Sequence, residues 1–205
     1  MPWVLDRGFT VVEQHDWLRP LRGDWLMRLE EAVLEAPDQV VLVAQGLGCH
    51  LVAAWAAHSQ QTARVRAALL VSPPHLPTPA LIQALPSWSP VVRQRLPFKA
   101  VVVGCEEAAQ GGLSSAQELA LDWGAPWVSA GPAAHIHTAS KLGDWPQGLA
   151  LLKPPWASSS QPTTTALKGR RWRTTEDQLG KACFSAGVCR WGGDTSKAAR
   201  TRAVC

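Results

Sequence analysis

Three short segments of this chain carry residues whose types and order suit hydrolytic chemistry. The first is the turn Ala44-Gln45-Gly46-Leu47-Gly48, the second is Gly104-Cys105-Glu106-Glu107, and the third is Ala133-Ala134-His135-Ile136-His137. A site of the Ser-His-Asp kind needs a nucleophile, a histidine that acts as its base, and a carboxylate that orients the histidine. The segments follow one another as nucleophile turn, acid and histidine, which is the chain order of an α/β-hydrolase.

The first segment has the outline of a nucleophile turn but lacks the nucleophile. Such a turn between a strand and a helix is sharp and strained, so it needs small residues two positions before and after its centre. Ala44 and Gly48 meet that need, but the centre is Gly46, which has no reactive atom. Taken alone, the same five residues also suit an ordinary connection between a strand and a helix, and the order of the three segments adds weight to the hydrolytic interpretation.

Neither nearby cysteine is a convincing replacement for the missing nucleophile. Cys49 lies one helical turn beyond the tip of the turn, so we expect it to point away and to be buried as a small apolar residue. Cys105 stands beside Glu106 and Glu107, whose negative charges would raise the pKa of its thiol and disfavour the reactive thiolate.

The elements that must position these loops alternate between strands and helices up to about residue 152. Runs of β-branched and other apolar residues predict strands, and apolar residues at helical spacing predict helices. This alternation predicts an α/β fold, a mostly parallel sheet with helices on both faces, whose site lies at the carboxyl ends of the strands. The expected strands are 9–12, 39–44, 65–71, 100–103 and 127–130, and the expected helices are 24–35, 47–58, 114–123 and 145–152.

Residues 154–205 differ in character from residues 1–153. The first part carries 11 Lys/Arg against 13 Asp/Glu, a net charge of −2, and the tail carries 9 against 3, a net charge of +6. The tail shows no sustained periodicity and is rich in Ser, Thr, Gly and Arg, so we expect it to be mostly disordered. A basic tail with tryptophans could serve as a nucleic-acid arm, but we favour an extension without that role, and the main body is not basic.

The composition places the protein among globular chains of a reducing compartment. The five cysteines are an odd number at irregular spacings, which fits neither a disulfide framework nor a zinc site. No apolar run reaches the roughly 18 residues of a membrane span, and the first residues do not read as a secretory signal. We therefore expect a cytoplasmic protein that has no membrane partner, and the sequence suggests no cofactor or metal.

Several blocks of the chain resemble the small serine hydrolases of the YdeN and retinoblastoma-binding-protein-nine type. They include "VLVAQGLGC", "ALLVSPP", "LPFKAVVVG", "LALDWGAPWVSAG" and "AAHIHTASKLGDWPQGLALL", and the resemblance covers residues 9–152. It implies a minimal α/β-hydrolase domain in residues 1–153 and an esterase-like activity. It also implies that His135 is the catalytic histidine and Glu107 the acid, where the family has aspartate.

The resemblance also implies that parts of the catalytic apparatus are missing. The family's elbow resembles Ala-His-Ser-Leu-Gly-Cys, so Gln45 stands for its histidine and Gly46 for its serine. The family opens with a strand and a Gly-rich loop that help to form the oxyanion hole, and this chain begins after the point where they would stand. We therefore expect an N-terminal truncation that leaves an open edge or a gap in the sheet.

Two functions remain open from the sequence. The first is a serine-hydrolase homologue whose hydrolysis is absent or strongly impaired, because its nucleophile position is vacant. The alternative is a pseudoenzyme that binds a small ester, acyl or carboxylate ligand, or a protein partner, in the vacated pocket. In that case the amide groups at the start of the following helix would supply anion-binding donors.

Overall fold

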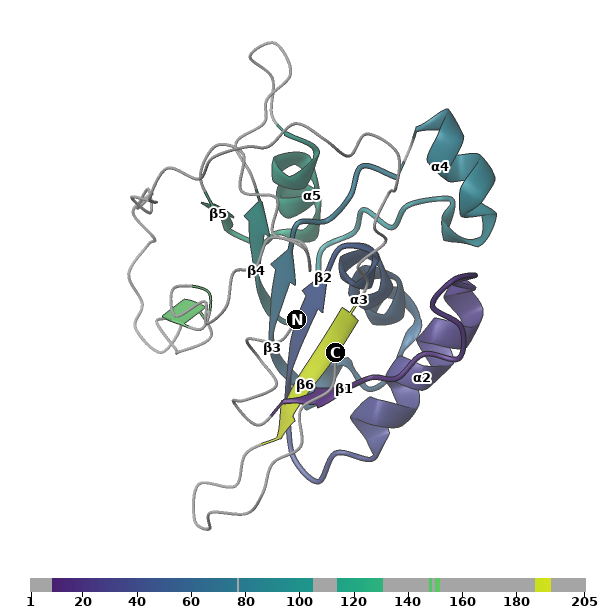
Figure 1. Ribbon diagram of the computed structural model, residues 1–205. Coiled ribbons are helices and arrows are strands. Elements are labelled where there is room, and N and C mark those ends of the chain that lie inside the picture. The colour runs from purple at the N-terminus through teal and green to yellow at the C-terminus, as the bar shows by residue number, and fades with distance from the viewer. Residues whose placement is uncertain are drawn as a thin grey trace, which may run out of the picture.

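The computed structural model describes residues 9–76, 78–104, 114–130, 148, 150, 151 and 187–192. Their centre is a six-stranded sheet with the strand order β1-β6-β2-β3-β4-β5 (Figure 1). Neighbours from β2 to β5 pair in parallel, whereas β6 pairs antiparallel with both β1 and β2. The mostly parallel sheet expected from the sequence is confirmed. The strands are β1 (Thr10–Val11), β2 (Val40–Gln45), β3 (Val65–Val71), β4 (Lys99–Gly104), β5 (Trp127–Ser129) and β6 (Gly187–Gly192).

The helices connect successive parallel strands, as right-handed crossovers between such strands require. α3 follows β2 directly and runs back over the sheet, and α5 joins β4 to β5 (Figure 1). The helices are α2 (Arg22–Leu34), α3 (Leu47–His58), α4 (Pro79–Ala84) and α5 (Ser115–Trp123), with short 3-10 turns η1 (Thr62–Arg64) and η2 (Pro86–Trp88). Helical backbone at positions 148, 150 and 151 falls within the helix expected at 145–152.

The interior of the sheet is apolar on both faces. Every residue of β2 is buried, as its continuous apolar run predicts. Val40 and Leu42 belong to one core with Trp25 of α2 and Trp123 of α5. Val41 lies between them in the strand, so its side chain is on the opposite face of the sheet. It is also buried, with 7% of its surface exposed. β2 is thus packed on both of its faces, and this packing fixes the position of its carboxyl end.

The edge of β2 that a missing first strand would leave open is occupied by β6. This strand pairs with β2 over Val40–Gln45 and with β1 through Thr10 and Val11 (Figure 1). Because β6 is antiparallel to both, β1 and β2 are parallel to each other and separated by the width of one strand. The prediction of a mostly disordered tail therefore missed a six-residue strand that lies between β1 and β2 in the sheet. The domain boundary at residue 153 stays a prediction.

The proline-rich connection between β3 and β4 contains the helix α4 and the 3-10 turn η2, neither of which was expected from the sequence. Thr78 caps α4 by accepting a hydrogen bond from the Leu81 amide at 3.4 Å, and Pro79 occupies the first turn, where its missing N–H is not needed. The serines at the start of α5 predict a cap at Ser114 or Ser115, and the cap is found at Ser114, which forms a reciprocal capping box with Gln117. None of the helices in the described ranges is long and apolar enough to span a membrane.

Candidate active site at the carboxyl edge of the sheet

Gly46 forms a sharp bend between the end of β2 and the start of α3. Its φ is 57° and its ψ is −125°, a conformation that glycine adopts far more easily than residues with a side chain. Its amide donates to the carbonyl oxygen of Val71 at 2.9 Å, which ties the bend to the end of β3. The nucleophile turn predicted at 44–48 therefore exists as a turn, and the position at its centre carries no side chain.

The ends of the parallel strands meet beside this bend. Gln45 of β2 is paired with Val71 of β3, and Val71 is paired with Val103 of β4. The residue after Val71, Ser72, donates its amide to the Val103 carbonyl oxygen at 2.7 Å. On the far side, the amide of Ala130 donates to the carbonyl oxygen of Gly104 at 2.8 Å. The loops expected to carry the acid and the histidine thus start from strand ends at the same edge as Gly46.

The predicted acid and base themselves lie outside the described residues. Glu107 and its neighbour Glu106 follow β4 by a few residues, and His135 and His137 follow β5 in the same way. The structure places only the strands that lead into these two loops. The convergence of Glu107 and His135 on Gly46 therefore stays a prediction, supported by the shared edge from which both loops depart.

Cys49 is buried in the first turn of α3, as expected. None of its surface is exposed, and its thiol lies 3.5 Å from the carbonyl oxygen of Ala44 and 3.4 Å from that of Val71. Burial raises the pKa of this thiol well above its ordinary value, because the surroundings disfavour the charged thiolate. Cys49 is therefore an inert packing residue, and Cys105 lies outside the described residues.

His50 is a buried titratable group that the sequence analysis did not single out. Only 4% of its surface is exposed, its Nε2 lies 2.9 Å from the carbonyl oxygen of Pro74, and its ring meets Trp123 edge-on at 5.8 Å. A carbonyl only accepts, so Nε2 carries the proton, and Nδ1 has no partner. Burial lowers the pKa of His50 to about 4, against the opposing effect of the Pro74 hydrogen bond, and the positive charge of Arg93 adds to the lowering. The sequence signal for the burial of His50 is its position in the apolar, Ala-rich segment that forms α3.

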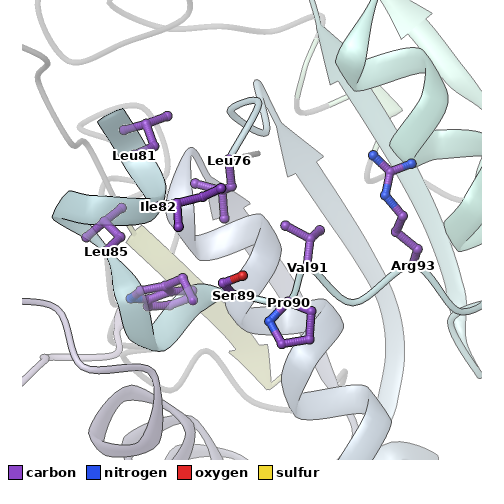
Figure 2. A pocket seen from close by; sticks show the side chains of 9 residues that line it. Leu76, Leu81, Ile82, Leu85, Ser89, Pro90, Val91 and Arg93 are labelled. Atoms are coloured by element: carbon purple, nitrogen blue, oxygen red, sulfur yellow. The ribbon is translucent and has the colours of Figure 1, made fainter. Parts of the chain in front are cut away.

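An apolar cavity of about 240 Å³ lies beyond the end of β3, between α4 and the chain that follows η2 (Figure 2). Figure 2 shows Arg93 extending away from Leu81 and Ile82, and its guanidinium pairs with Asp122 of α5 at 2.7 Å. The side chains of the cavity wall are therefore mostly apolar, the aliphatic stem of Arg93 included, and Ser89 adds a hydroxyl. Its lining residues are Leu76, Leu81, Ile82, Leu85, Trp88, Ser89, Pro90, Val91 and Arg93.

The part of the chain that the structure describes contains no group of three His, Cys, Asp or Glu side chains that could hold a metal ion. Within that part, the polar groups at the sheet edge include backbone amides, the Gln45 carboxamide and the Ser72 hydroxyl.

Known proteins resemble this chain in sequence and in fold. A family model described as serine hydrolase matches residues 5–154. No curated protein matches the chain. A crystal structure described as that of a YdeN-like hydrolase from Pectobacterium atrosepticum is similar in fold, with a TM-score of 0.56 and 18% sequence identity. The match covers 68% of this chain and 71% of that one. At this level of identity the structural likeness shows the fold alone.

Proposed function

This chain belongs to the serine hydrolase family, whose model spans residues 5–154, and from that premise we propose that its nucleophile position is vacant. Ester hydrolysis is then absent or strongly impaired. One observation carries the proposal: Gly46 occupies the centre of the sharp turn between β2 and α3. A serine hydrolase forms its acyl-enzyme through a hydroxyl at this point, and glycine has none.

Glu107 and His135 are the acid and the base that the family pattern leaves in this chain. In a complete site they would activate the serine hydroxyl, but here they could at best activate a water molecule. Removal of one member of a catalytic triad lowers the rate by several orders of magnitude, and the remaining rate over water comes from oxyanion stabilisation and binding. We therefore expect a hydrolytic rate close to that of the uncatalysed reaction.

A second function, ligand binding without turnover, is favoured by the free hydroxyl beside Gly46. The Ser72 Oγ is buried and has no hydrogen-bond partner. A small ester, acyl or carboxylate compound at the vacated turn would satisfy it.

We also propose a cytoplasmic location, because the odd number of cysteines at irregular spacings suits a reducing compartment.

A fluorophosphonate probe, which labels activated serines covalently, tests the vacant position. The wild-type protein is expected to stay unlabelled, and Gly46→Ser is expected to gain labelling if the rest of the site is intact. Gly46→Ala is the matched control, because it imposes the same backbone strain as serine without supplying a nucleophile. In the Gly46→Ser background, His135→Ala is expected to remove the labelling, since the hydroxyl then lacks its base.

Hydrolysis of p-nitrophenyl acetate provides an independent readout. The wild type is expected to match a buffer blank. A wild-type rate well above the blank that disappears in His135→Ala would show that the site turns over without a serine at position 46, and would refute the proposal.

A further inference from the structure

Ser72 occupies the position beside Gly46 at the carboxyl end of the neighbouring strand. It directly follows Val71, whose carbonyl oxygen accepts from the Gly46 amide at 2.9 Å. Ser72 donates its own amide to Val103 on the other side, at 2.7 Å. The residue is thus fixed between β2 and β4 at the edge where a parallel sheet places its ligands.

The backbone of Ser72 is in a conformation that serine rarely adopts. Its φ is +49°, and within the described ranges it is the sole residue other than glycine with a positive φ. Such a conformation costs free energy and persists when the surrounding structure imposes it, which occurs most often at functional sites. Here the backbone is held on one side by the hydrogen bond that Val71 accepts from Gly46 and on the other by the hydrogen bond that Ser72 donates to Val103.

The Ser72 hydroxyl is buried without a partner. Its Oγ is inaccessible to solvent and makes no hydrogen bond. Nearly all buried polar atoms in folded proteins are hydrogen-bonded, and one that is not calls for an explanation such as a ligand. The unpaired hydroxyl and the unusual backbone occur in one residue, Ser72, which lies beside Gly46 at the centre of the turn.

We propose that Ser72 is the ligand-binding hydroxyl of this site and donates a hydrogen bond to the carbonyl oxygen of a small uncharged acyl compound, such as a short ester or amide. The inference rests on the proposed function, because it assigns non-covalent ligand binding to a turn that has no nucleophile at position 46. Binding is non-covalent, and no bond is formed or broken.

The residues around the strand ends favour an uncharged ligand over an anion. Residues 44–49, 70–76 and 102–104 include no Lys or Arg. A carboxylate beside these described segments would lose its hydration without gaining an opposite charge from them, which is costly, whereas a carbonyl oxygen needs only the single donor that Ser72 supplies. An amide or ester should therefore bind more tightly than the carboxylate of the same chain length.

Titration of the full-length protein with N-ethylbutyramide, ethyl butyrate and sodium butyrate, followed by protein NMR chemical shifts, tests the inference. The amide and ester are expected to bind the wild type more tightly than butyrate does. Ser72→Ala is expected to weaken amide binding about tenfold, which corresponds to the loss of one hydrogen bond. Ser115→Ala, which changes a serine in α5, is the matched control and should bind as the wild type does.

The melting temperature of the ligand-free variants distinguishes a binding role from a structural one. A hydroxyl without a partner stabilises nothing, so Ser72→Ala is expected to melt at or above the wild-type temperature. Unchanged amide binding by Ser72→Ala, a lower melting temperature of this variant, or no binding of any of the three compounds to the wild type would each overturn the inference. None of these results would alter the outcome of fluorophosphonate labelling, so failure of this inference is distinguishable from failure of the vacant-nucleophile proposal.

Discussion

The buried imidazole of His50 should make the stability of this protein depend on pH in a defined range. The pKa of His50 is lowered to about 4 in the folded chain, chiefly because burial disfavours the charged ring. In the unfolded chain the ring is hydrated, and its pKa returns to the ordinary value of about 6.5. Between these two values the unfolded chain binds a proton that the folded chain does not.

The sign and size of the effect follow from this difference. Above about pH 6.5 both states hold a neutral His50, so the group adds no pH dependence to the free energy of unfolding. As the pH falls from about 6.5 to 4, the unfolded state gains the proton and stability is lost. One pKa unit corresponds to about 1.4 kcal/mol, so the loss approaches about 3 kcal/mol near pH 4. Below that pH both states are protonated and the loss from this group stops growing.

Urea unfolding at several pH values between 4 and 8 measures the effect. His50→Gln is expected to flatten the dependence between pH 6.5 and 4, because glutamine does not titrate but can still donate to the Pro74 carbonyl oxygen. His58→Gln, at the exposed end of the same helix, is the matched control and should keep the wild-type slope. The carboxyl of Asp16 does not interfere, since the hydrogen bonds from the Arg19 and Leu18 amides lower its pKa below 3.8 and its contribution is lost only in stronger acid. A wild-type slope retained in His50→Gln would refute the assignment.

Three further predictions concern the scaffold. Gly124 ends α5 with a left-handed φ of 66°, which a residue with a side chain adopts at a cost in free energy, so Gly124→Ala should lower the free energy of unfolding in urea by about 1–2 kcal/mol. Gly23→Ala, at a glycine inside α2 where nothing lies within 4 Å, is its control and should not destabilise; equal losses in both would contradict the conformational reason. Cys189→Pro should lower the melting temperature far more than Cys189→Ala, because proline cannot donate to the sheet ladder in which β6 lies between two strands; similar melting would show that β6 adds little. Iodoacetamide should modify Cys49 only after denaturant is added, and mass mapping of a native adduct on Cys49 would contradict its burial.

The parts of the fold that could be predicted from the sequence are those written in local patterns. The continuous apolar run of β2 and the small residues at 44 and 48 predict a buried strand followed by a sharp turn, and both are found. The serine cap of α5 is equally local, since either Ser114 or Ser115 predicts it, and Ser114 is the residue that supplies it. The family expected from the resemblance is likewise confirmed.

β6 could not be predicted in the same way. Its six residues have no clear alternation and stand in a basic segment, so nothing local distinguishes them from the rest of the tail. What makes them a strand is pairing with Val40–Gln45, far away in the sequence. Strand formation by tertiary pairing routinely overrides local propensity. For the same reason the backbone conformation of Ser72 could not be predicted, because it depends on neighbours brought together only by the fold.

The conformation of Gly46 explains how the turn between β2 and α3 can keep its sharp bend with glycine at its centre. A nucleophile turn holds its central residue in a strained conformation, which a side chain makes more costly and glycine makes less so. At a φ of 57° and a ψ of −125°, Gly46 keeps the bend and its hydrogen bond to Val71 while it avoids that cost. The turn is held by backbone pairing and by the buried strand and helix on either side, and none of these contacts involves a side chain at position 46. The shape of the turn and the chemistry of a nucleophile at its centre therefore depend on different atoms, which is what the proposal of a vacant nucleophile position requires.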